Sequence, residues 1–99
     1  MKNINPASMA QAIMQAQRIK KDLQKVRDKI KREKFSYNSD VLSLVINGEG
    51  EIISISIKSG FSNIEIEREV LKAHKDIESR IKQFSNTLME PFAQYKDLM

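Results

Sequence analysis

The chain has 99 residues, with 17 Lys and Arg against 13 Asp and Glu, a single His and no Cys. This length predicts one domain spanning residues 1–99. The absence of cysteine excludes disulfides and thiolate metal sites. No apolar run approaches the roughly 18 residues of a membrane span, and residues 1–6 lack the apolar core of a signal peptide. We therefore expect a soluble cytoplasmic protein that carries no cofactor.

Charge is unevenly distributed along the chain. Residues 1–34 hold ten Lys and Arg against three acidic residues, a net charge of +7, whereas residues 35–99 sum to −3. Such asymmetry favours contact between the N-terminal third and a polyanion. The alternative interpretation is a helix face that is simply solvated.

A long helix is predicted from Pro6 to about Lys34. Asn5 is a typical N-cap and Pro6 suits the first helical position. No Gly or Pro interrupts the following residues, and apolar side chains repeat in heptads: Met9, Ala16, Leu23 and Ile30 in one set, and Ala12, Ile19 and Val26 in the other. Because such a helix is longer than a 99-residue globule, its outer part must project or pack on a partner.

Basic residues follow the same spacing on the face away from this apolar seam. They are Arg18, Lys21, Lys25 and Arg32, interrupted by Asp28 and flanked by Lys20, Arg27, Lys31 and Lys34. Like charges at this density oppose helix formation, so a function is a reasonable explanation for their clustering. As contacts to DNA phosphates we predict Arg18, Lys20, Lys21, Lys25, Arg27, Lys31 and Arg32.

A β-hairpin is predicted at the centre of the chain. Two runs rich in Val, Ile and Leu flank Asn47–Gly50, and Asn-Gly tolerates the positive φ of tight turns. A four-residue loop at Asn47–Gly50 would place Leu44 opposite Ile53 and Leu42 opposite Ile55. Val45 and Ile52 would then lie on the second face of the hairpin.

The remaining elements are a short strand and a second helix. Residues 35–38 alternate apolar and polar side chains, which indicates a strand. Ser62 and Glu65 match a capping box for a helix that runs to about Met89, where Pro91 ends or kinks it. The expected buried side of this helix is Ile66, Val70, His74, Ile77, Ile81, Phe84 and Leu88, and a short helical tail would place Phe92, Tyr95 and Leu98 at i,i+3 spacing.

These elements predict an α+β fold of order α-β-β-β-α, with long helices flanking a small antiparallel sheet. Three strands and two helices of this length expose too much apolar surface for a monomer, so we expect a two-fold homodimer. The residues predicted at its interface are Val45, Ile52, Leu23 and Val26.

Residues suited to catalysis are few. His74 is the only histidine and is expected to be a packed or interfacial residue. A metal site would rest on carboxylates alone, and neither a phosphate-binding loop nor a nucleophile elbow is present. We expect no enzyme and no small-molecule substrate. No aromatic platform lies among the basic residues, which favours duplex DNA over single strands.

Together these motifs resemble the YbaB/EbfC family of bacterial nucleoid-associated proteins over nearly the whole chain. The motifs that carry the resemblance are Gln15-Ala16-Gln17 with the apolar heptads after it, Leu44-Val45-Ile46-Asn47-Gly48, and Ala73-His74-Lys75-Asp76 followed by Arg80-Ile81. Three features depart from the family pattern: Asn38-Ser39-Asp40 replaces a glycine-rich loop, Lys75 an asparagine, and Ser59-Gly60-Phe61 a Pro-x-Leu-Leu stretch.

The resemblance implies a tight homodimer whose helices project like tweezers, and DNA binding on the nucleoid with a role in its organisation and in gene regulation. The competing hypothesis is a coiled-coil module that uses its heptad seam and C-terminal tail to hold another protein without binding DNA. A membrane-surface helix is less favoured, because core and dimer packing explain the apolar seam.

Overall fold

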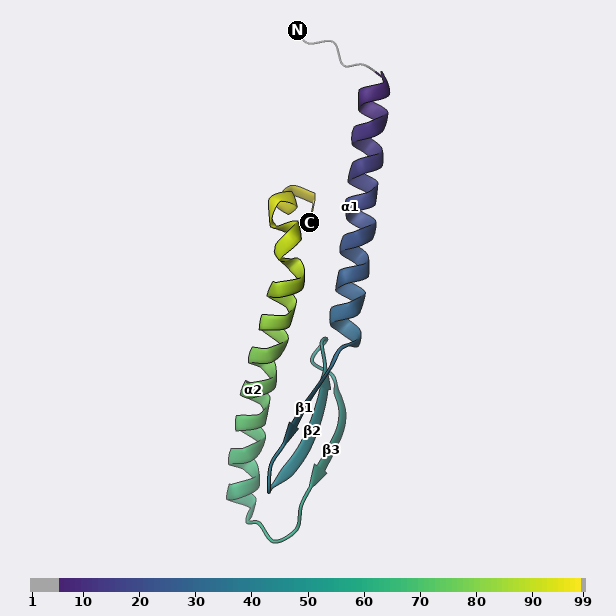
Figure 1. Cartoon of the computed structure of the whole chain (residues 1–99). Helices are drawn as coiled ribbons and strands as arrows, with labels where there is room; N and C mark the ends of the chain where they lie inside the picture. The colour runs from purple at the N-terminus through teal and green to yellow at the C-terminus, as the bar shows by residue number, and fades with distance from the viewer. Residues whose placement is uncertain (1–5, 99) are drawn as a thin grey trace.

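The computed structural model describes residues 6–98, with side chains to residue 95. The chain forms two long helices around three strands, as predicted (Figure 1). The elements are α1 (Pro6–Arg32), β1 (Lys34–Asn38), β2 (Leu42–Asn47), β3 (Ile52–Ile57), α2 (Asn63–Met89) and a 3₁₀ helix, η1 (Glu90–Leu98). The predicted cap, Asn5, and the terminal Met99 lie outside the described residues.

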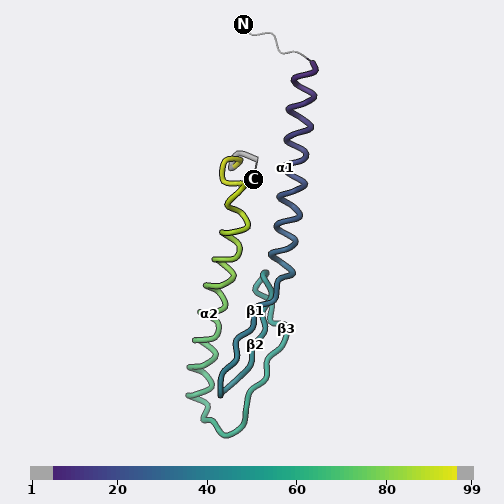
Figure 2. The backbone as a smooth tube through the Cα atoms, in the orientation of Figure 1, coloured from purple at the N-terminus to yellow at the C-terminus, as the bar shows by residue number. Residues whose placement is uncertain are grey.

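The molecule is a rod of 75 × 20 × 14 Å. Helices α1 and α2 run antiparallel, and the backbone tube shows the sheet beside the first half of α2 and α1 beside its second half (Figures 1 and 2). The N-terminal part of α1 extends past η1, so the outer part of the first helix projects, as its length predicted.

The hydrophobic core lies between α2 and two of the three strands. The sheet is antiparallel in the order β1-β2-β3, and α2 contacts β1 and β2. The buried residues of this cluster are Phe35, Leu42, Leu44, Ile46, Ala73 and Ile77. Phe35 also meets Phe84 edge to face, with ring centroids 5.7 Å apart. Helix α2 does not cover strand β3, and all six residues of β3 are exposed.

The register of the hairpin differs from the prediction. Asn47 N–H donates to the Glu51 carbonyl and Gly50, at φ 86°, donates to the Asn47 carbonyl, so the loop holds three residues instead of four. Ile46 pairs with Ile52 and Val45 with Ser54, which leaves Ile53 as a β-bulge. The predicted pairing of Leu44 with Ile53 is therefore wrong.

The three-residue loop shifts the predicted register by one residue, so that Ile52 lies opposite Ile46, and the bulge shifts it by one more. Leu44 therefore lies opposite Ile55 and Leu42 opposite Ile57. The isoleucines of β3 therefore continue the apolar face of β2 past the edge of α2.

Two polar contacts fasten α2 to β1. The Tyr37 hydroxyl donates to Glu69 at 2.6 Å, and this hydrogen bond to a carboxylate raises the pKa of Tyr37 above its ordinary value of 10.0. Arg80 donates to the Ser36 carbonyl, and its Nε lies 3.1 Å from Asp76. The short strand is thus held at two separate points along the helix.

The ends of α2 follow the local signals in the sequence. Ser62 accepts from the Glu65 N–H and Glu65 reaches back to Ser62, which confirms the capping box. The helix ends at Met89, two residues before Pro91. The prediction that His74 lies on the buried side of α2 is wrong. His74 is exposed, whereas its neighbour Ala73 is fully buried in the core.

Candidate nucleic-acid interface

One row of cations runs along the C-terminal half of α1. Its members recur at intervals of three or four residues, so they lie on one helical face: Arg18, Lys21, Lys25, Lys29 and Arg32. We call these five residues the first row. It spans about 21 Å at 1.5 Å per residue. Lys29, which was not among the predicted contacts, is exposed on the same face, and its spacing of four from Lys25 is a signal already present in the sequence.

A second row lies on another face of the same helix. Lys20, Arg27 and Lys31 are separated by seven and four residues, and each is exposed. Between the rows runs a strip with Gln24 and Asp28, whose side chains share a hydrogen bond of 3.0 Å. We call the three cations the second row. The seven predicted phosphate contacts therefore divide between two parallel rows.

The cations of both rows are accessible. All eight are exposed. Among the residues that the structure describes, ion pairs form within α2, between His74 and Glu78 and between Arg80 and Asp76, and none includes a cation of either row. The positive charge of α1 is therefore available to an external anion.

The hairpin loop holds the end of α1 in place. Gly48 N–H donates to the Glu33 carbonyl at 3.0 Å, just beyond the last turn of the helix. A Cβ atom on Gly48 would lie 1.7 Å from the Ile30 carbonyl oxygen, so only glycine fits this approach. The Asn-Gly pattern predicts that Gly48 is a glycine because the turn needs a positive φ. Its φ is not positive, and the absence of a side chain instead allows the loop to lie close to α1.

Asn47 organises the rest of the loop. Its Oδ1 accepts from the N–H groups of Glu49 and Glu51, and its Nδ2 donates to the Glu51 carboxylate at 3.0 Å. This donor lowers the pKa of Glu51, whereas a side-chain hydrogen bond with Glu51 raises the pKa of Glu49. Lys31 of the second row acts on the pKa of Glu49 in the opposite direction. Asn47 thus makes side-chain contacts with both acidic residues, Glu49 and Glu51.

The four residues predicted at a dimer interface are in different environments. Leu23 is only 3% exposed and already belongs to the packing within one chain, so it has little area left for a partner. Val26 and Val45 are half-buried. Ile52 is 62% exposed, and Ile53, Ile55 and Ile57 beside it are about half exposed. The largest uncovered apolar surface of the sheet is thus its β3 edge.

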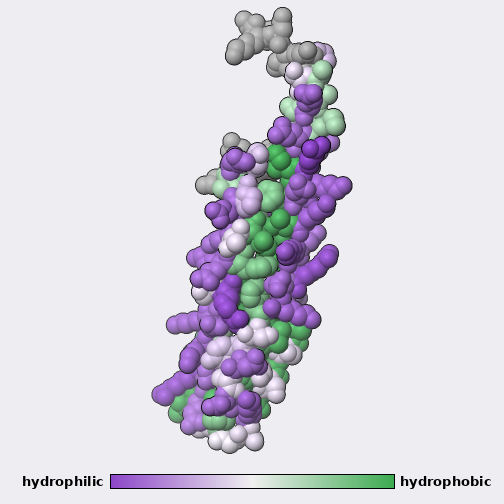
Figure 3. All heavy atoms as spheres, viewed as in Figure 1, coloured by the Kyte–Doolittle hydropathy of each residue, from purple (hydrophilic) through white to green (hydrophobic). Residues whose placement is uncertain are grey.

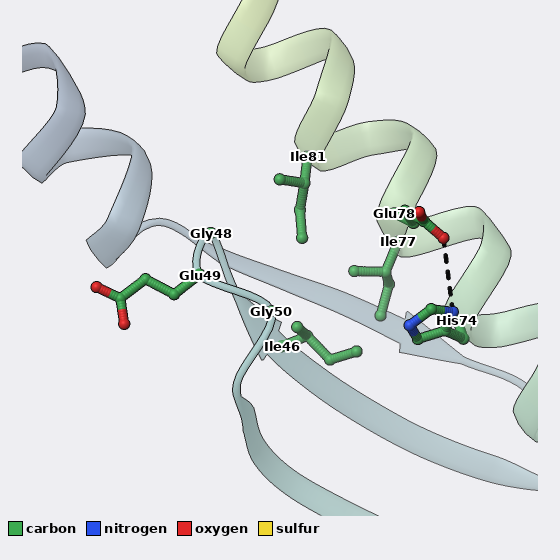
Figure 4. A pocket seen from close by; sticks show the side chains of 8 residues that line it. All are labelled: Ile46, Gly48, Glu49, Gly50, His74, Ile77, Glu78 and Ile81. Atoms are coloured by element: carbon green, nitrogen blue, oxygen red, sulfur yellow. Dashed lines mark ion pairs between the residues drawn. The ribbon is translucent and has the colours of Figure 1, made fainter.

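A hollow of about 290 Å³ lies between the loop and α2 (Figure 4). Ile46, Ile77 and Ile81 form its apolar wall, while His74 at the rim lies 3.7 Å from Glu78. Both of these side chains are well exposed, and no group of three or more His, Cys, Asp or Glu in the described chain could hold a metal ion. We assign no chemistry to this hollow.

The surface separates polar from apolar side chains. Figure 3 shows an apolar strip between α1 and α2, with hydrophilic side chains projecting on either side. No helix within residues 6–98 is both long and apolar enough to cross a membrane. The exposed cations of α1 lie at regular intervals in its C-terminal half, from Arg18 to Arg32.

A comparison with known protein families finds one match that covers nearly the whole chain. The model described as the YbaB/EbfC DNA-binding family matches residues 5–96, which include both rows, the sheet and all of α2. The chain matches no curated protein and no solved structure.

Proposed function

The chain belongs to the YbaB/EbfC DNA-binding family, and from that premise we infer that it binds duplex DNA mainly through the backbone phosphates. The family is one of nucleoid-associated DNA-binding proteins, not of enzymes. The observation that carries the proposal is the pair of exposed cation rows on α1. Each cation that neutralises a phosphate releases counterions, and this favours binding without reading any base.

The active form that we propose is a homodimer joined along the β3 edges. An uncovered edge strand offers free backbone groups as well as apolar side chains to a second copy. Four isoleucines on one edge, each roughly half exposed or more, support this surface over the buried Leu23. Val26 and Val45 are the other residues that we place near the partner. Two protomers would present two copies of α1 to one duplex.

A dimer of this kind coats or links DNA on the bacterial nucleoid, and it regulates genes where its binding excludes other proteins. Uniform phosphate contacts predict weak sequence preference. The competing coiled-coil function receives less support, because Leu23 of the heptad seam is already packed within the chain.

The test is a salt-titrated binding assay on random and defined duplexes. In one variant Lys21, Lys25 and Arg32 of the first row become Glu, and in a second variant Lys20, Arg27 and Lys31 of the second row become Glu. We expect the affinity to fall and the slope of log affinity against log salt to decrease by about 0.9 for each phosphate that the variant no longer neutralises.

A matched control separates local contact from total charge. Lys72, Lys75 and Lys82 are exposed on α2, and changing them to Glu alters the net charge of the protein by the same amount. We expect this control to keep most of the affinity and the wild-type salt slope. If both row variants bind DNA as the control does, the assignment of the site to α1 is wrong.

A further inference from the structure

The first twelve residues of α1 differ in character from the rest of the helix. Residues 6–17, which we call the tip, contain no charged side chain, whereas the following residues carry both cation rows. Every residue from 6 to 15 is exposed. The tip projects past η1 in Figure 1, and the space-filling view shows pale green apolar atoms there among hydrophilic ones (Figure 3).

The tip carries one continuous apolar stripe. Met9, Ala12, Ile13 and Ala16 lie at i, i+3, i+4 and i+7, which is one face of a helix. Met9 is 48% and Ile13 54% exposed. The stripe continues into Ile19 and Leu23, which become half-buried and buried where α2 and η1 begin to cover the helix. Within one chain the described residues thus leave the upper end of the seam uncovered.

We propose that the stripe Met9-Ala12-Ile13-Ala16 packs against the same stripe of a second copy. Absence of charge removes the repulsion that would keep the basic parts of two α1 helices apart. The alanines allow two helix backbones to approach closely, and methionine adapts its shape to an irregular contact. The tips therefore form a contact between copies that is separate from the β3 edges and from the cation rows.

Other occupants fit the tip less well. A nucleic acid requires cations, and none lies within residues 6–17. A membrane surface favours a helix whose polar face is rich in Lys and Arg, and the polar face here carries Gln.

The size of the stripe sets the strength of the contact. The tip is about 18 Å long at 1.5 Å per residue, which is too short to bury the roughly 1,200 Å² of a stable interface. The association is therefore weak and becomes effective when copies are held close together, as on one DNA molecule. Because the contact is apolar, added salt leaves it intact while it weakens phosphate binding.

Thiol cross-linking traps such a weak contact, and the chain has no native cysteine to interfere. Met9→Cys and Ile13→Cys place single thiols on the stripe. Gln11→Cys is the matched control, because it is exposed on the opposite side of the same turns. With a short bismaleimide and purified protein without DNA, we expect covalent dimers to form several-fold faster from the stripe variants than from the control.

A second substitution tests the physical cause. Adding Ile13→Lys to Met9→Cys places like charges in the contact, and we expect its cross-linking to fall to the control rate, with circular dichroism unchanged because Ile13 is outside the core. Equal rates for Met9→Cys and Gln11→Cys, or no effect of Ile13→Lys, would overturn the proposal. The experiment contains no DNA, so its outcome is separate from that of the DNA-binding proposal.

Discussion

At the scale of single residues, Gly48 shows how one position joins two elements. Turn geometry and close packing are both reasons for a glycine, and at this position the structure supports close packing. The hydrogen bond to Glu33 and the contact with Ile30 together fix the loop against the end of α1. By contrast, Gly50 has φ 86°, and a Cβ atom added to it would meet nothing within 4 Å, so the reason for glycine there is conformational.

Gly48→Ala therefore separates packing from backbone strain. The added methyl group collides with backbone atoms of α1, and we expect a loss of about 2 kcal/mol of unfolding free energy, as for an overpacked core site. Gly50→Ala, the matched control, meets only the cost of a left-handed conformation, about 1 kcal/mol. Urea denaturation of both variants measures the difference. An equal or smaller loss for Gly48→Ala would contradict the close-contact role.

At the scale of elements, α2 depends on its N-terminal cap. Ser62→Ala removes the acceptor for the Glu65 N–H, and we expect a loss of about 1 kcal/mol in unfolding free energy. Ser79→Ala changes an exposed serine in the middle of the same helix, and we expect a change within about 0.5 kcal/mol. Chemical denaturation compares the two variants, and similar effects at both positions would show that the capping box contributes little.

Elements defined by neighbouring residues are predictable from the sequence. The capping box, the end of α2 before Pro91 and the start of α1 at Pro6 all depend on a few adjacent side chains. The cation rows are predictable for the same reason, because residues three or four apart share a face on any regular helix. Lys29 has the same spacing and is exposed, so it belongs to the first row, although it was not among the predicted contacts.

Features that leave no periodic pattern in the sequence were not predictable. The loop contains three hydrogen bonds between Asn47 and the residues Glu49 and Glu51, and the bulge at Ile53 follows it; neither feature has a periodic trace. The apolar periodicity of α2 predicts His74 on its buried side. Its exposure follows from the width of the sheet contact, which reaches Ala73 and Ile77 but stops before the next residue around the helix.

At the scale of the whole molecule, α2 is too narrow to cover a three-stranded sheet. The uncovered β3 edge is the physical reason to expect a second protomer, because four exposed isoleucines on one strand are costly in water.

Ile55→Lys tests the proposed homodimer. A charge at the centre of the edge should disfavour pairing, and we expect light scattering to report the mass of a single chain where the unaltered protein gives twice that mass. Leu71→Lys is the control, because Leu71 is 67% exposed on the outer side of α2. A dimeric Ile55→Lys variant would move the interface away from β3.

The joint at Gly48 also has a mechanical consequence. Helix α1 is about 40 Å long at 1.5 Å per residue. The hairpin loop contacts its C-terminal end, and α2 and η1 contact it further along. The first row extends about 21 Å from that end, so a rotation of about ten degrees at the loop would displace Arg18 by about 4 Å, roughly one base-pair step of 3.4 Å along a DNA strand. In the complex with DNA that we propose, the contact at Gly48 would therefore help to set which phosphates the cations of α1 reach.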